Sequence, residues 1–64
     1  MFILKIETDN AAFDDGNLNA ETARILRETA DKLESGRDGG HCRDINGNTV
    51  GGFELTTTEA NSLA

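Results

Sequence analysis

The residue types that most often carry chemistry are scarce in this chain of 64 residues, which has one histidine, His41, and one cysteine, Cys42. Neighbouring residues on an extended strand face opposite sides, so this adjacent pair cannot form the hydrogen-bonded couple that a cysteine nucleophile needs. A structural zinc site takes four cysteine or histidine ligands, which a monomer of this chain cannot supply. The sequence therefore predicts no enzyme and no zinc site, with Cys42 as a small buried residue and His41 as an exposed one.

A second arrangement of side chains comes close to a calcium-binding loop. Asp44, Asn46 and Asn48 have the spacing of the first three ligands of an EF-hand. The EF-hand then requires a glycine and, at its end, a glutamate, where this chain has Thr49 and Leu55. The flanking segments also have the pattern of strands, and turn formation explains the same aspartate and asparagines without a metal. We therefore expect no metal site and no cofactor.

Carboxylates are the one reactive group that the chain has in excess. Twelve aspartates and glutamates face six lysines and arginines, which gives a formal charge of −6. A chain this acidic is repelled by nucleic-acid phosphates and anionic lipid and is steered toward basic protein surfaces. Two interpretations are open: the carboxylates only keep the protein soluble, or they imitate a row of phosphates.

The excess acids are not spread evenly along the sequence. Four acids and four bases balance each other within residues 21–37, so the negative excess lies before and after that stretch, in the predicted loops and hairpin. On the phosphate-imitating interpretation these flanking acids would contact the partner. The candidate partner-binding residues are Asp9, Asp14, Asp15, Asp38, Asp44 and Glu54.

One amphipathic helix, predicted over residues 19–36, is the element around which the others must pack. Its apolar residues recur at helical spacing and form one stripe. They are Ala23, Ile25, Leu26, Ala30 and Leu33. Asn19 is expected to cap the first turn through its side chain. Gly36 is expected to end the helix, because glycine tolerates the left-handed backbone conformation that follows a last turn.

Strands are predicted on both sides of this helix. In residues 2–8, Phe2, Leu4 and Ile6 alternate with other residues and form one apolar face. Residues 9–18 have the composition of a polar loop. Phe13 is the exception in that loop, and we expect its ring to close one end of the core.

Residues 41–50 are predicted to form a β-hairpin, because the Asn-Gly pair at 46–47 is a strong turn signal. A loop of two residues competes with a loop of three. The three-residue loop is favoured because it pairs Cys42 with Val50 and so places two apolar residues together. The glycine pair at 51–52 then indicates a bulge or bend that brings the next apolar residues to the same face.

These elements predict an α+β fold in one small domain over residues 1–55, with a polar tail at 56–64. The order is β-α-β-β, with a three-stranded sheet and the helix packed on one face; a right-handed parallel crossover is possible, and the partner of the first strand stays open. The expected core is Phe2, Leu4, Ile6, Phe13, Leu18, Ala23, Leu26, Ala30, Leu33, Cys42, Val50, Phe53 and Leu55. A domain of this size is marginally stable, so dimerisation would help it.

The same composition bears on the compartment. The apolar run at residues 2–4 is too short for a signal sequence, and no segment has the length and apolar character of a membrane span. A single cysteine cannot form an internal disulfide, which fits a reducing compartment. The expectation is a cytoplasmic protein.

Three stretches resemble a family of short proteins from phages and prophages. They are the Ile-Glu-Thr-Asp-Asn-Ala-Ala-Phe opening at 6–13, the helix sequence at 23–34, and the Arg-Asp-Ile-Asn-Gly-Asn-Thr-Val-Gly hairpin at 43–51. The likeness covers most of residues 3–54, and the Asp-Ile-Asn-Gly-Asn turn is its most specific part. A small acidic phage protein is also similar in type to the anti-CRISPR proteins. Several of those imitate duplex DNA at the basic PAM-reading site of a Cascade complex, and a type I-C inhibitor is the case nearest in size and charge.

This resemblance implies a non-enzymatic inhibitor in the bacterial cytoplasm. It would bind the PAM-reading subunit of a type I Cascade with an acidic, DNA-like surface, as a monomer or a homodimer, and would itself bind neither nucleic acid nor membrane. The alternative is a phage accessory or structural interaction module that binds through its sheet face, or as a homodimer, without DNA mimicry.

Overall fold

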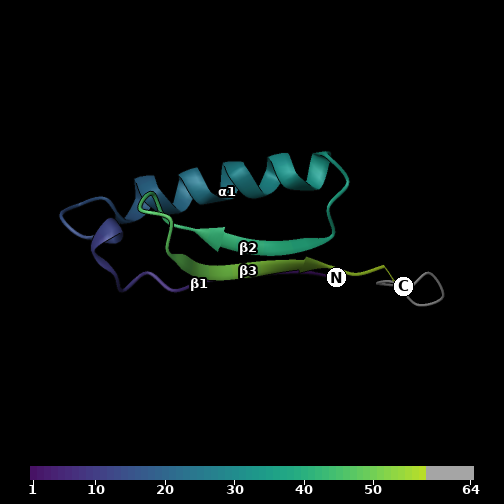
Figure 1. The fold of residues 1–64 in the computed structure, drawn as a ribbon, viewed down its shortest axis with the longest axis horizontal. Helices are drawn as coiled ribbons and strands as arrows, with labels where there is room; N and C mark the ends of the chain where they lie inside the picture. Colours follow the sequence, from purple (N-terminus) through teal and green to yellow (C-terminus); the bar gives the residue numbers. More distant parts are fainter. Residues whose placement is uncertain (58–64) are drawn as a thin grey trace.

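The computed structural model describes residues 1–57 and has the α+β architecture that the sequence predicts (Figure 1). In chain order the elements are β1 (Phe2–Ile6), a 3-10 turn η1 (Ala11–Phe13), α1 (Leu18–Glu34), β2 (Gly39–Arg43) and β3 (Thr49–Leu55). Most of the predicted tail, residues 58–64, lies outside the described part of the chain. No helix within residues 1–57 combines the length and the apolar character needed to cross a membrane.

The three strands form one sheet in the order β1-β3-β2, and both pairings are antiparallel. The first strand, whose partner the sequence left open, pairs with β3, from Phe2 opposite Leu55 to Ile6 opposite Gly51. The long connection through α1 therefore joins the two edge strands, which run parallel to each other with β3 between them. The helix lies along one face of this sheet (Figure 1).

The hairpin between β2 and β3 has the predicted loop of three residues. The amide of Asp44 donates to the carbonyl of Asn48 at 2.9 Å, and the amide of Gly47 donates to the carbonyl of Asp44 at 3.0 Å. Gly47 has a φ of 85°, the left-handed conformation that this loop requires. The choice between the two loop lengths is thus confirmed.

The predicted pairing of Cys42 with Val50 is wrong by one residue. Cys42 lies opposite Gly51, whereas its neighbour Arg43 lies opposite Thr49. Val50 is therefore the extra residue of a β-bulge, one position before the glycine pair that indicated one. Without this bulge, the residues of β3 that follow would turn their apolar side chains away from the helix.

The core sits between α1 and the sheet. Its buried residues are Phe13, Ile25, Cys42, Val50 and Phe53, and the partly buried Leu4, Ile6, Ala12 and Leu33 pack against them. Phe13 is only 4% exposed, so the prediction that its ring closes the core is confirmed.

Several residues predicted for the core lie on the surface instead. They are Phe2, Leu18, Leu26, Ala30 and Leu55; Ala23 is half-buried. The helix turns the stripe of Glu21, Ile25 and Thr29 toward the sheet, rather than one centred on Leu26. Two polar residues can occupy this stripe because the helix and the hairpin satisfy their hydrogen bonds; the Thr29 hydroxyl, for example, donates to the carbonyl of Ile25 at 2.9 Å.

The sequence predicts the end of α1 correctly, but not the residue at its N-cap. Asn19 lies inside the first turn and does not cap it; the N-cap position is taken by Asn17, whose side chain makes no capping hydrogen bond. The predicted end at Gly36 is confirmed. Gly36 has a φ of 100°, and amides at positions 36 and 37 donate back to the last turn in the Schellman pattern.

Candidate functional site

The loop between β1 and α1 concentrates negative charge in sequence. The chain has five acids and no lysine or arginine between residues 6 and 23. Four of these acids have exposed side chains, namely Glu7, Asp9, Asp14 and Asp15. We call residues 7–15, which carry all four of them, the acidic loop. It contains three of the six predicted partner-binding residues.

Two residues of the same loop hold it against the rest of the molecule. The side-chain oxygen of Asn10 accepts from the amide of Ala12 at 3.0 Å and so caps η1, while its Nδ2 donates to Oδ2 of Asp44 at 2.7 Å. Three residues later the ring of Phe13 is buried in the core. The loop is therefore fixed at both ends of η1, and its carboxylates are presented from an ordered backbone.

Asp14 and Asp15 lie in a tight turn that leads into α1. The amide of Asn17 donates to the carbonyl of Asp14 at 3.1 Å, and both central residues have positive φ, 57° for Asp15 and 81° for Gly16. Aspartate and asparagine are the non-glycine residues that best tolerate this conformation. The turn thus displays two neighbouring carboxylates in a geometry that an asparagine could keep.

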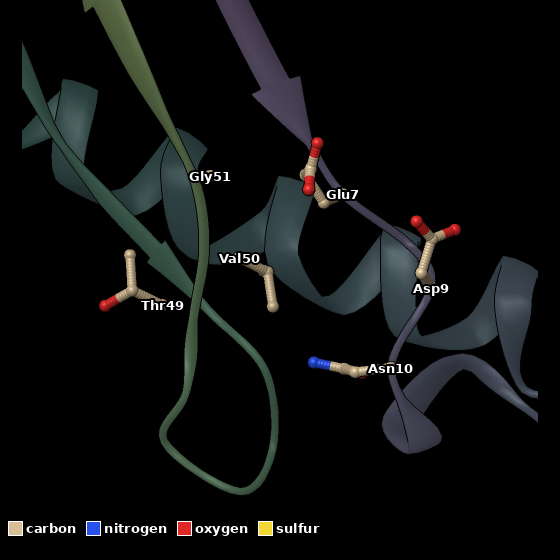
Figure 2. Close-up of a pocket in the computed structure, with 6 residues that line it drawn as sticks. All are labelled: Glu7, Asp9, Asn10, Thr49, Val50 and Gly51. Carbon is tan, nitrogen blue, oxygen red and sulfur yellow. The ribbon is translucent and has the colours of Figure 1, made fainter.

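An open hollow of about 380 Å³ lies beside the first part of the acidic loop, and Figure 2 shows the residues around it. It is lined by Glu7, Asp9, Asn10, Thr49, Val50 and Gly51. Two carboxylates from the segment after β1 border one side, and the start of β3 forms the other (Figure 2). Val50 is the one apolar side chain of this lining, and the acids beside it are suited to the cationic head of a lysine or arginine.

Asp44, a predicted contact residue, is instead buried, with 4% of its surface exposed. Its carboxylate accepts four hydrogen bonds: from the amides of Asn46 and Asn48 at 2.9 and 2.8 Å, and from the side chains of Asn10 and Asn48 at 2.7 and 3.1 Å. Burial raises the pKa of Asp44, but the donors outweigh burial and hold that pKa below its ordinary value. Asp44 therefore joins the hairpin to the acidic loop, and its oxygens are engaged within the chain.

Glu21, which lies outside the predicted apolar stripe of the helix, is a second buried carboxylate. Both of its oxygens contact the guanidinium of Arg24, at 2.8 and 3.0 Å, and Oε2 also accepts from the amide of Ile45 at 2.7 Å. The hydrogen bonds from Arg24 lower the pKa of Glu21, burial opposes them, and the Ile45 amide lowers it further. The three-residue spacing from Arg24 could have indicated the ion pair. Nothing in the sequence indicated the contact with the hairpin.

The remaining two predicted contacts lie far from the acidic loop. Asp38 precedes β2, and its carbonyl accepts from the amide of Leu55 at 2.7 Å. Glu54 is exposed on β3, opposite Ile3. Both are at the end of the sheet where β1 begins, whereas the acidic loop follows the end of β1 (Figure 1). The structure thus divides the predicted set into a loop group, a pair at the other end, and one interior residue.

Cys42 is buried, as predicted, with 2% of its surface exposed and its sulfur 3.8 Å from the Thr29 hydroxyl. His41, on the other side of β2, is exposed. Within the described residues, no three histidine, cysteine, aspartate or glutamate side chains are grouped closely enough to hold a metal ion.

No protein-family model matches the chain, and no curated protein or solved structure matches it either. The resemblance to phage proteins therefore stays a prediction.

Proposed function

We propose that the protein is a non-enzymatic inhibitor that binds, through its acidic loop, a basic groove used by its partner for nucleic acid. The observation that carries this proposal is a loop with four exposed carboxylates, no base between residues 6 and 23, and anchors at Asn10 and Phe13. Negative charge steers the protein toward a lysine- and arginine-rich groove. An ordered loop also loses little conformational freedom on binding.

The resemblance to phage proteins selects the partner in this proposal, the PAM-reading subunit of a type I Cascade in the cytoplasm of a bacterial host. On this proposal, the basic groove of that subunit holds duplex DNA when the Cascade effector searches for its target. A bound acidic loop would exclude the DNA by occupying the same cationic side chains. The inhibitor needs no cofactor and no contact of its own with nucleic acid or membrane.

A competition experiment with purified type I-C Cascade and a labelled target duplex tests the proposal. The wild-type protein is expected to displace the duplex. The triple variant Asp9→Asn, Asp14→Asn, Asp15→Asn removes three charges without changing side-chain size, and asparagine keeps the left-handed backbone at position 15. Exposed ion pairs contribute about 0.2–1 kcal/mol each, so we expect its inhibition constant to rise roughly 3- to 150-fold.

The control is Asp38→Asn, Glu54→Gln, which removes two charges at the other end of the sheet and is also compared with the double variant Asp14→Asn, Asp15→Asn. We expect its inhibition constant to stay within about twofold of wild type, because these side chains lie outside the proposed contact. A similar loss in both variants would mean that net charge acts rather than the loop. Failure of the wild-type protein to displace DNA would refute the inhibitor proposal itself.

A second candidate function is a phage accessory or structural interaction module without DNA mimicry. The outer face of the sheet favours it, because that face has a hollow of about 430 Å³. The hollow is lined by Ile3, Lys5, Gly40, His41, Gly52, Phe53 and Glu54. Binding there would change little between about 50 and 500 mM salt, whereas binding through the acidic loop would weaken as charges are screened.

A further inference from the structure

The sheet has two edges, and α1 covers the backbone of only one. At the β2 edge, Nζ of Lys32 donates to the carbonyl of His41 at 2.9 Å, and the guanidinium of Arg24 donates to the carbonyl of Arg43 at 2.9 Å. Two cationic side chains from the helix thus occupy alternate carbonyls of this strand. That arrangement blocks the addition of another strand at β2.

Within residues 1–57, no side chain bonds in this way to the outer backbone groups of the β1 edge. Met1 and Thr56 exchange two hydrogen bonds, at 2.7 and 2.9 Å, and the amide of Glu7 donates to the carbonyl of Val50 at 2.7 Å. In an antiparallel ladder such pairs alternate, so the odd-numbered residues of β1 bond to β3. The amides and carbonyls of the even-numbered residues, 2, 4 and 6, therefore point away from the sheet.

Apolar side chains next to this edge are also uncovered. Arg24 and Lys32 reach over β2, so the opposite flank of α1, which carries Leu26, is turned toward the β1 side. Leu26 is 47% exposed, and the paired residues Phe2 and Leu55 are 44% and 39% exposed. The ring of Phe2 lies 6.4 Å from the ring of buried Phe53, so this exposed surface continues directly into the core.

We propose that a second copy of this chain pairs with β1, antiparallel about a two-fold axis at Leu4, to give a six-stranded sheet. The strand is complementary to itself in this register. On the helix side Phe2 faces Ile6 of the second copy and Leu4 faces Leu4, so apolar side chains meet apolar ones. A register centred on Lys5 would instead place two lysines directly opposite each other.

The distribution of charge fits the same arrangement. Although the chain is acidic overall, the only charged residue of β1 is Lys5. Because the two β1 strands run in opposite directions, the acidic loops that follow them lie at opposite ends of the shared sheet. The like charges of the two copies are therefore kept apart, and the interface itself carries no carboxylate from β1.

Charge substitutions at Ile3 test the pairing. A charge placed there would be repelled by its neighbour within the chain and attracted by its neighbour in the second copy, or the reverse. Ile3 lies opposite Glu54 of its own chain and, in the proposed register, opposite Lys5 of the second copy. Ile3→Glu therefore creates repulsion within the monomer and two attractive pairs across the dimer; Ile3→Lys does the reverse. By sedimentation equilibrium at about 150 mM salt, we expect Ile3→Glu to lower the dimer Kd roughly 2- to 30-fold and Ile3→Lys to raise it similarly.

Cysteine cross-linking tests the register independently. Leu4→Cys would place two thiols within disulfide range across the axis. Ile6→Cys would put each thiol opposite Phe2 of the second copy, about 13 Å from its symmetry mate. Under mild oxidation the first variant should form a covalent dimer and the second should not. A wild-type protein that sediments as a monomer at all concentrations, shifts of equal sign for both Ile3 variants, or equal cross-linking of both cysteine variants would overturn the proposal.

Discussion

At the scale of single residues, the sequence predicts two roles for the carboxylate of Asp44, a partner contact and a turn, and the structure confirms only the turn. Asp44 is both an acid in the charge-rich part of the chain and the first residue of a turn. Four donors surround it: three hydrogen bonds come from Asn46 and Asn48 of the turn and the fourth comes from Asn10, so its oxygens are engaged within the chain. The sequence shows the turn partners two and four residues away. It does not show Asn10, which reaches Asp44 only through the fold.

Replacing Asp44 with asparagine is expected to lower the melting temperature at pH 7. An asparagine keeps one acceptor oxygen for the backbone amides, but its NH2 group would face the donors of Asn10 and Asn48. Circular dichroism of thermal unfolding measures the change. Asp38→Asn, at an exposed site, is the control and is expected to melt like wild type. Equal melting temperatures for the two variants would contradict the anchoring role of Asp44.

The two buried carboxylates, of Glu21 and Asp44, predict how the stability of the fold depends on pH. The pKa values of Glu21 and Asp44 lie below their ordinary values in the folded chain, whereas the unfolded chain has values near 4.3 and 3.9. Their stabilisation is therefore complete only above these unfolded values, from about pH 5 upward, and is lost as the pH falls through the lower folded values. Melting curves from pH 7 to pH 2 should show this loss in wild type and a smaller one in Asp44→Asn. An unchanged acid profile in the variant would contradict the assignment.

At the scale of elements, the sequence was informative where local chemistry decides the outcome. Asn46 and Gly47 indicated the hairpin loop, Gly36 marked the end of α1, and alternation indicated β1. The polar part of the buried face of α1, Glu21 and Thr29, was missed because apolar periodicity ignores polar residues whose partners come from elsewhere in the fold. The pairing of β1 with β3 depends on contacts about fifty residues apart, and no local pattern encodes it.

Two substitutions on neighbouring residues of α1 test which face is buried. Ile25 is 1% exposed and Leu26 is 47% exposed. Ile25→Val removes one methyl from the core and is expected to lower the free energy of unfolding by about 0.5–1.5 kcal/mol. Leu26→Ala, measured by urea unfolding at low protein concentration, is expected to change it by less than about 0.5 kcal/mol. The reverse order of effects would favour the apolar stripe that the sequence suggested.

Gly51, the residue that follows the bulge in β3, gives a further prediction about how closely the strands pack. A Cβ on Gly51 would lie 1.8 Å from the carbonyl oxygen of Lys5, so the two strands could not keep their spacing. At Gly40 the nearest atom to an added Cβ belongs to the ring of Phe53, at 3.2 Å, and a ring can shift slightly. We expect Gly51→Ala to cost about 1–3 kcal/mol in urea unfolding, and Gly40→Ala to cost less. A Gly51→Ala protein as stable as wild type would argue against this strand pairing.

At the scale of the whole molecule, negative charge is arranged by the fold rather than by the number of acids. The balanced charges of α1 are partly used internally, since Arg24 contacts both Glu21 and Glu28 at 2.8 and 2.7 Å. The acidic loop keeps its carboxylates exposed at one end of the sheet, while the apolar edge of β1 lies along its side. From the sequence the excess of acids could be predicted, together with three of the residues in this loop. Their separation from Asp38 and Glu54 required the topology of the sheet.

The most direct test of the proposed contact is the affinity of the protein for purified Cascade, measured by calorimetry from about 50 to 500 mM salt. Screening shortens the reach of charge from about 10 Å at 0.1 M to about 3 Å at 1 M. We predict that the wild-type affinity falls about tenfold or more over this range. The triple variant Asp9→Asn, Asp14→Asn, Asp15→Asn should start weaker and fall less. A wild-type affinity that is independent of salt, or a triple variant that binds as tightly as wild type at low salt, would contradict the account.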